Sequence, residues 1–162
     1  TRGDIFSICE RDVADGLFAS VIWGYPRGMR GNNFMKFLAN IDEIKRTVSF
    51  NKSLSHADLT HLLNVLGIGI STISKFLYFF RCSYNGHKCL ILDEVMNGIC
   101  KGEVFSEDFP LLKNSGNYRD KAITFYPTYL ESMTNIAKKL DATEERVESF
   151  LFLVGRNFLP SH

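Results

Sequence analysis

Two apolar helical patterns flank a Gly-x-Gly sequence in the middle of this chain, and this arrangement constrains the fold more than any other feature. Gly67 and Gly69 separate an apolar segment that ends near Leu66 from a second one that begins near Ser71. The second segment has the i, i+3, i+4, i+7 spacing of a buried helix face, formed by Ile73, Phe76, Leu77 and Phe80. Both glycines permit a positive φ and the close approach of another backbone. We therefore predict two helices joined by a tight hairpin.

The hairpin is a candidate phosphate-binding element. The backbone amides of Gly67, Gly69, Ile70 and Ser71 would lie at the N-terminus of the second helix, and such a group of amides attracts a phosphate. Because backbone amides bind every phosphate equally well, this hairpin would position the protein on DNA without reading its sequence. A short glycine motif is also typical of a plain turn between antiparallel helices, where the glycines serve packing alone.

Lys75 and Asp93 are the candidate reactive residues. Lys75 is off the apolar face of the second helix and is predicted to face a cleft, where apolar neighbours would lower the pKa of its amine and make it a nucleophile. Asp93 follows the apolar run Cys89–Leu92, where a carboxylate needs a partner. In the alternative interpretation, Lys75 is a solvated surface residue and Asp93 is only the N-cap of the helix that carries Val95 and Met96.

Together, these features resemble the helix-hairpin-helix DNA glycosylases. The run Ser71–Leu77 and the sequence Ile91-Leu92-Asp93 are similar to the archaeal 8-oxoguanine glycosylases and to bacterial proteins with an OGG-like fold. This alignment implies Lys75 as the Schiff-base nucleophile and Asp93, 18 residues later, as its activator and electrostatic partner.

A second alignment places the family lysine differently. In enzymes such as endonuclease III, the lysine comes two residues after the second hairpin glycine, and this chain has Ser71 there. In that respect the chain is similar to the monofunctional adenine glycosylases, which also lack the lysine at this position.

The resemblance implies a DNA glycosylase and AP lyase that removes a modified purine such as 8-oxoguanine from duplex DNA, in DNA repair or in bacterial anti-phage defence. It implies no metal and no organic cofactor. We also expect no iron–sulfur cluster, because only Cys100 follows Asp93 where related enzymes have four cysteines. The alternatives are a monofunctional glycosylase and a non-catalytic helix-hairpin-helix module that binds DNA or a protein.

A Gly-rich loop that starts near residue 23 is a candidate base pocket. Trp23, Tyr25 and Arg27 could stack on a flipped base and hydrogen-bond its edges. Structural loops use similar residues, so packing is the competing interpretation. By resemblance, a C-terminal aromatic residue also stacks on the extruded base. Phe152 is a better candidate for this role than Phe150, because it lies off the apolar face of its helix, although core packing is the simpler role for both.

We expect an all-α fold, with residues 1–162 in a single helical domain. Ser55 is predicted to cap the helix that contains Leu66, and Pro127 to lie in the first turn of a later helix. Thr143 is predicted to cap the last helix. The buried face of that helix would contain Val147, Phe150, Leu151 and Val154. We predict an extended connector at Cys89–Leu92 and a surface loop at Lys113–Tyr118.

Charge and composition limit the possible partners. The net charge is only +1, whereas nucleic-acid-binding proteins usually have a basic balance. However, residues 16–41 and 59–92 contain no acid, so a shared surface would form a positive face for DNA. The four cysteines lack C-x-x-C spacing, and no apolar run is long enough to cross a membrane. We expect a cytoplasmic monomer that binds DNA and no membrane.

Overall fold

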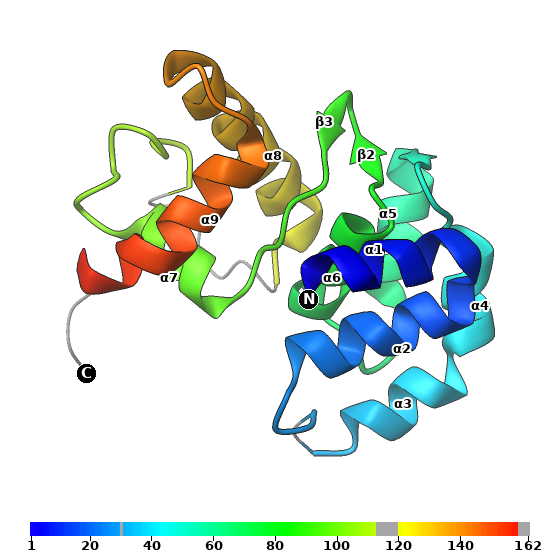
Figure 1. Ribbon diagram of the computed structural model, residues 1–162. Coiled ribbons are helices and arrows are strands. Elements are labelled where there is room, and N and C mark those ends of the chain that lie inside the picture. Colours follow the sequence, from blue (N-terminus) through cyan, green and yellow to red (C-terminus); the bar gives the residue numbers. More distant parts are fainter. Residues whose placement is uncertain (30, 113–119, 159–162) are drawn as a thin grey trace. The chain divides into compact units, whose positions relative to one another are not determined.

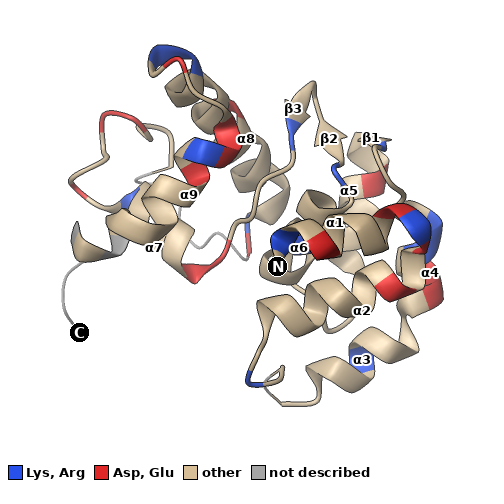
Figure 2. Cartoon of the chain, in the orientation of Figure 1, with Lys and Arg blue, Asp and Glu red and all other residues tan. Residues whose placement is uncertain are grey.

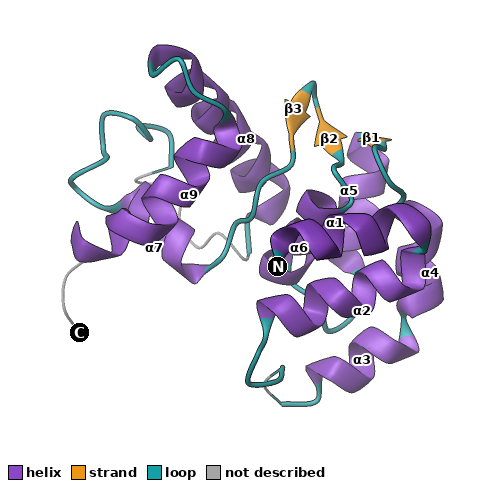
Figure 3. Ribbon diagram, in the orientation of Figure 1, coloured by secondary structure: helices purple, strands orange, loops and turns teal. Residues whose placement is uncertain are grey.

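The computed structural model describes residues 1–29, 31–112 and 120–158. It divides into two compact units, Thr1–Cys89 and Leu90–His162. Helices dominate both units, and the described strands have two residues each (Figures 1 and 3). The all-α expectation is therefore confirmed, whereas the single domain stays a prediction. The predicted loop Lys113–Tyr118 and Arg30 of the Gly-rich loop lie outside the described residues.

The first unit is built around helix α6. Its described elements are α1 (Arg2–Arg11), α2 (Val13–Gly24), α3 (Asn33–Ala39), α4 (Ile41–Thr47), β1 (Ser53–Leu54), α5 (His56–Asn64), α6 (Ile70–Phe79), β2 (Ser83–Tyr84) and β3 (His87–Lys88). Helices α1, α2 and α5 all contact α6. The residues of the predicted apolar face of α6 are buried, which confirms that face. The buried surface of the helix is wider than predicted, because every residue from Thr72 to Phe80 is buried.

Aromatic rings cover the C-terminal half of α6. The ring centroid of Phe79 lies 5.0 Å from that of Trp23 on α2 and 5.5 Å from that of Phe6 on α1. Phe6 also contacts Tyr78, at 5.4 Å. Such edge and tilted contacts favour a fixed packing arrangement, so α1 and α2 are held on one side of α6.

A small sheet closes the first unit. Strand β1 pairs with β2 in parallel, and β2 pairs with β3 in antiparallel orientation. Asn85 and Gly86 join β2 to β3 with φ values of 50° and 79°, which is the turn geometry that an Asn-Gly pair favours between strands. After this hairpin, residues 89–93 belong to no helix or strand, which confirms the predicted extended connector.

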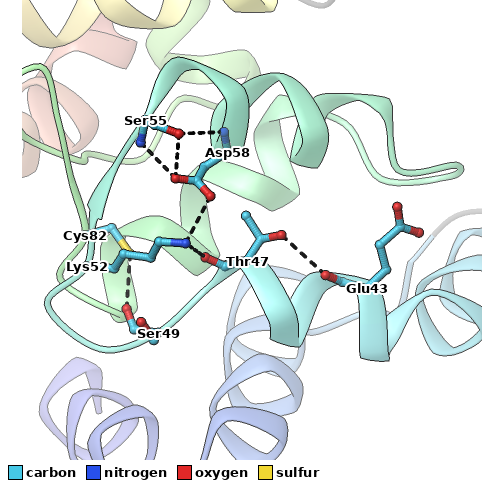
Figure 4. Close-up of polar contacts among 7 residues, drawn as sticks. All are labelled: Glu43, Thr47, Ser49, Lys52, Ser55, Asp58 and Cys82. Atoms are coloured by element: carbon cyan, nitrogen blue, oxygen red, sulfur yellow. Dashed lines mark hydrogen bonds and ion pairs between the residues drawn. The ribbon is translucent and has the colours of Figure 1, made fainter.

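A half-buried lysine, Lys52, fixes the start of α5. Lys52 donates from Nζ to the Thr47 carbonyl at 2.7 Å and to Asp58 Oδ1 at 3.0 Å (Figure 4). Asp58 also accepts from the backbone N–H and the hydroxyl of Ser55, while Ser55 Oγ accepts from the Asp58 N–H. This reciprocal capping box confirms the predicted helix start.

The second unit contains three α-helices in its described part. They are α7 (Glu94–Lys101), α8 (Ala122–Lys139) and α9 (Glu144–Val154), and the 3₁₀-helix η1 (Gly155–Phe158) follows. Thr143 Oγ1 accepts from the Arg146 N–H, which confirms the predicted N-cap of α9. Tyr129, Leu130 and Met133 form part of the buried face of α8.

Three details of the predicted helices are wrong. Helix α8 begins at Ala122, so Pro127 lies inside it rather than in its first turn. A proline inside a helix costs about 3 kcal/mol of stability. The burial of Phe125 and Tyr126 offsets this cost, so the helix continues through Pro127. Helix α5 ends at Asn64, so Leu66 lies beyond it and is 70% exposed.

The third error concerns Phe150, which is 58% exposed rather than buried. Helix α9 instead buries Val147, Glu148 and Leu151. Phe150 lines one side of an apolar cavity of about 280 Å³, together with Leu140 and Phe105. The predicted apolar face is therefore rotated toward Glu148.

All four cysteines are buried, and none of them forms a disulfide. Burial raises the pKa of the Cys9 thiol to about 11 and that of Cys82 to about 12. A thiol must ionise to act as a nucleophile, so neither cysteine is suited to this role. In the described parts of the chain, no helix is long and apolar enough to cross a membrane.

We predict that Asp58→Asn lowers the free energy of unfolding at neutral pH by about 1 to 2 kcal/mol, because it weakens the capping box. The hydrogen bond from the Ser55 backbone N–H, followed by the Ser55 hydroxyl and Lys52, lowers the pKa of Asp58 from 3.8 to about 2. A lowered folded-state pKa stabilises the fold above pH 3.8, and this contribution is lost as the pH falls through about 2.

Urea denaturation of wild type and variant checks both statements, since the difference between them should shrink as the pH falls below about 4. Asp42→Asn is the control, because Asp42 is 85% exposed and lies 3.8 Å from Lys45 in a surface pair. That change should cost less than about 0.5 kcal/mol. Equal effects of the two substitutions would contradict the role of Asp58.

Candidate active site

The hairpin between α5 and α6 has the predicted position and a partly different geometry. Gly67 has a φ of +87°, as expected for a glycine turn. Gly69 has a φ of −108° and is the N-cap of α6, so only Gly67 uses the positive φ that glycine permits. A Cβ added at Gly69 would meet no atom within 4 Å. Gly69 therefore leaves open space beside the first turn of α6.

The N-terminus of α6 has no side-chain cap. The amides of Ile70 and Ser71 have no acceptor within the helix, whereas the Thr72 N–H donates to the Gly69 carbonyl at 2.9 Å. Ile70 is buried, whereas Ser71 is half-buried. The four predicted DNA-binding residues, Gly67, Gly69, Ile70 and Ser71, are thus together at this helix end, and their contact with DNA stays a prediction.

Helix α3 supports the hairpin and adds a positive charge to it. Asn40 Nδ2 donates to the Leu66 carbonyl at 3.3 Å and to the Lys36 carbonyl at 2.8 Å. The Lys36 side chain lies directly over Gly67, where an added Cβ would collide with it. Figure 2 shows no acidic residue on α3, in contrast to α4. The two acid-free segments of the sequence therefore meet at this hairpin.

Lys75 of α6 is buried, with only 5% of its surface exposed. Its Nζ donates to the Ser71 carbonyl at 2.8 Å and to Ser71 Oγ at 3.1 Å. The side chain therefore runs back along α6 by one turn, and the amine lies beside Ser71. The alternative interpretation of Lys75 as a solvated surface residue is wrong, because the residue is buried.

Residues at the end of α2 contact the same amine. The Tyr25 ring centroid lies 5.3 Å from Lys75 Nζ. The Tyr25 hydroxyl lies 2.6 Å from Thr72 Oγ1, in a hydrogen bond that either group can donate. A Cβ added at Gly24 would lie 2.5 Å from Lys75 Cδ. We call Gly24, Tyr25, Ser71, Thr72 and Lys75 the Lys75 cluster.

Asp93 belongs to the second unit and is the N-cap of α7. Its Oδ1 accepts from the backbone N–H groups of Val95 at 3.0 Å and Met96 at 3.1 Å. Among the described residues, no donor hydrogen-bonds Oδ2. The capping role is confirmed and leaves one carboxylate oxygen for another function. Lys75 and Asp93 belong to different units, so their pairing stays a prediction.

Two buried tyrosines of α8 hold the connector that leads to Asp93. The hydroxyl of Tyr126 donates to the Leu90 carbonyl, and that of Tyr129 donates to the Ile91 carbonyl, both at 2.9 Å. Burial, followed by the charge of Glu148, raises the pKa of Tyr129 well above 10.0, so this hydroxyl stays a donor. The sequence analysis did not identify this anchoring role, since Tyr129 follows the apolar pattern of α8.

The remaining candidates for a base pocket have separate environments. Trp23 is half-buried and packs on Phe79, with the Arg2 guanidinium 5.3 Å from its ring centroid. Arg27 is exposed in the turn after α2, and Phe152 is half-buried on α9 of the second unit. Their contact with a base stays a prediction. In the described part of the chain, no group of three His, Cys, Asp or Glu residues could hold a metal ion.

We predict that Gly67→Ala destabilises the protein by about 1 to 3 kcal/mol, because alanine is strained at a positive φ and its Cβ would displace Lys36. Gly69→Ala should change the free energy of unfolding by less than about 0.5 kcal/mol, because a φ of −108° suits alanine and the added Cβ enters open space. Urea denaturation of the two variants checks this contrast. A larger loss from Gly69→Ala would contradict the hairpin geometry.

The comparison with known protein families agrees with the resemblance found in the sequence. The family model described as "Putative 8-oxoguanine DNA glycosylase OGG-like protein" matches residues 1–152. No curated protein and no solved structure matches the chain. The family match extends over nearly the whole chain, from α1 into α9. The chain therefore belongs to the OGG-like family of DNA glycosylases.

Proposed function

We propose that this DNA glycosylase is bifunctional: it excises a modified purine from DNA and then cleaves the strand through a Schiff base on Lys75. Asp93 is the second catalytic residue in this proposal. The family match supports DNA as the substrate and an 8-oxoguanine-like base as the target.

The position of the Lys75 amine carries the proposal. Ser71 stands two residues after Gly69, where enzymes similar to endonuclease III have their lysine. Because Lys75 Nζ donates to both the carbonyl and the hydroxyl of Ser71, the amine lies next to that position. Lys75 lies one helical turn after Ser71, but its side chain reaches back and brings the amine beside Ser71. The amine is thus close to the position at which the second alignment expects the family lysine. The two alignments of the sequence are compatible in space.

In the proposed reaction, the neutral Lys75 amine attacks C1′ of a flipped nucleotide. The bond between C1′ and the base breaks, and the base leaves with the electron pair and is protonated. Asp93 stabilises the positive charge on the sugar and accepts a proton from the attacking amine. Opening of the sugar ring gives the Schiff base, and β-elimination then breaks the C3′–O bond on the 3′ side of the lesion.

The hairpin would hold the DNA during this reaction. Amides at an uncapped helix N-terminus attract phosphate oxygens, and Gly69 leaves room for a close approach. Lys36, which lies over Gly67, would add a positive charge to the same phosphate. The exposed Arg27 and the aromatic residues Trp23 and Phe152 are the proposed base contacts.

A monofunctional glycosylase is the second candidate. Ser71 at the second alignment's lysine position favours it, and so does the burial of Lys75. In that reaction, Asp93 would activate water in place of an amine. A role in repair and a role in anti-phage defence use the same chemistry, and both are compatible with the family match.

Borohydride trapping on duplex DNA that contains 8-oxoguanine or an abasic site tests the proposal. We expect a covalent complex with wild type and at least about a 100-fold loss of it in Lys75→Gln, because a glutamine amide cannot form a Schiff base. DNA affinity should change less than about 3-fold in that variant. Lys45→Gln is the control, since Lys45 is an exposed lysine of α4.

Trapping by Lys75→Gln at the wild-type level would assign the nucleophile to another residue. Base release by wild type without any trapped complex would favour the monofunctional glycosylase. DNA binding with neither base release nor trapping would favour a non-catalytic module.

We also predict that Lys36→Gln weakens DNA binding equally on different sequences. It should reduce the slope of log affinity against log salt concentration by about 0.9, the effect of one lost phosphate contact. Fluorescence anisotropy at several salt concentrations measures this slope. Lys45→Gln again serves as the control and should leave the slope unchanged. An unchanged slope in Lys36→Gln would exclude Lys36 from the DNA contact.

A further inference from the structure

Tyr25, at the end of α2, is held in place beside Lys75. Stacking on a flipped base would not require these contacts. Tyr25 is the C-cap of α2, and its backbone N–H donates to the Val21 carbonyl at 2.9 Å. The far end of the side chain is bound to Thr72 Oγ1 at 2.6 Å, and Thr72 is only 4% exposed. The ring is therefore held at both ends, on two helices that contact each other.

The fixed ring lies over the amine of Lys75, whose Nζ is 5.3 Å from the ring centroid. A protonated amine within about 6 Å of an aromatic ring centroid is attracted by the electron density of the ring. Nζ also donates to the carbonyl and the hydroxyl of Ser71. The amine thus lies between the Tyr25 ring and the Ser71 oxygens, which restricts its position in two directions.

Gly24 provides the space for this arrangement. A Cβ at this position would lie 2.5 Å from Cδ and 2.9 Å from Cε of Lys75. The stem of Lys75 therefore passes directly over the backbone of the last residue of α2. A side chain at position 24 would displace the stem and move the amine from Ser71.

We propose that Gly24 and Tyr25 are positioning residues for the Lys75 nucleophile. Ser71 and Thr72 complete the set, Ser71 by accepting from the amine and Thr72 by fixing the Tyr25 ring. This inference rests on the proposed Schiff-base function of Lys75. It assigns Tyr25 to the amine rather than to the flipped base, and the two roles predict different substrate dependence.

Single-turnover trapping on an abasic site separates these roles, because that substrate has no base to stack on. We expect Tyr25→Leu to slow trapping on the abasic site by about 10- to 100-fold, since a small displacement of a reacting group can cost that much. Half-saturation by DNA should change by less than about 3-fold. Tyr25→Phe keeps the ring and should recover most of the rate. A base-stacking role instead predicts a normal rate for Tyr25→Leu on the abasic site and slow excision of 8-oxoguanine.

Phe50→Leu is the matched control. Phe50 is half-buried and also has a cation over its ring, since the Arg81 guanidinium lies 5.8 Å from the centroid. Removing this ring deletes a contact of the same kind away from Lys75 and should leave the trapping rate unchanged. A similar loss in Phe50→Leu and Tyr25→Leu would show a general effect on the fold and overturn the proposal.

Gly24→Ala provides a second variant that keeps Tyr25. It should reduce trapping at least as strongly as Tyr25→Leu, while Gly3→Ala, whose Cβ would meet only Thr1 Oγ1 at 3.6 Å, should have no effect. If the wild type is trapped and both Tyr25→Leu and Gly24→Ala are trapped at the same rate, this inference is overturned and the Schiff-base function is left intact. Absence of trapping by wild type would overturn the Schiff-base function itself.

Discussion

Burial of a lysine in helix α6 is the constraint on which the rest of the first unit depends. A charged amine in an apolar surrounding is costly unless polar groups contact it. Lys75 meets this requirement by reaching back to the carbonyl and hydroxyl of Ser71. The neighbouring structure is adapted to the same side chain, because Gly24 leaves room for its stem and the Tyr25 ring lies over its amine. A lysine that served only the fold would be replaced at lower cost by an apolar residue, which favours a chemical role for this amine.

The second unit applies similar constraints to Asp93. Its Oδ1 is occupied by two amides at the start of α7, so the carboxylate is held in one orientation. The preceding connector is anchored by hydroxyl groups of Tyr126 and Tyr129. Backbone carbonyls of a buried loop need such donors. Together, these contacts fix the position of Asp93 on α7 and the direction from which the chain reaches it.

Local signals in the sequence predict the helix starts well. Ser55, Asp93 and Thr143 all cap the helices for which they were proposed, because a cap depends on residues within one turn. Predictions that depend on tertiary contacts are less accurate. Packing of Tyr126 decides that α8 continues through Pro127, and rotation of α9 buries Glu148 and exposes Phe150.

The candidate site shows the same division. The hairpin and the type of its residues could be recognised from Gly67 and Gly69, although only Gly67 has a positive φ. The Asn85-Gly86 turn was also readable as a hairpin signal, but its strands have only two residues each. The contacts of Gly24 and Tyr25 with Lys75 could not be predicted, because they join residues about 50 positions apart and depend on how α2 packs on α6.

The most direct test of the account is to identify the amino acid that carries the trapped DNA. After borohydride reduction of wild type on an abasic duplex, proteolysis and mass spectrometry locate the modified residue. The account predicts that the sugar remnant is attached to Lys75. Attachment to any other amine of the chain, in protein that retains the native fold, would contradict it.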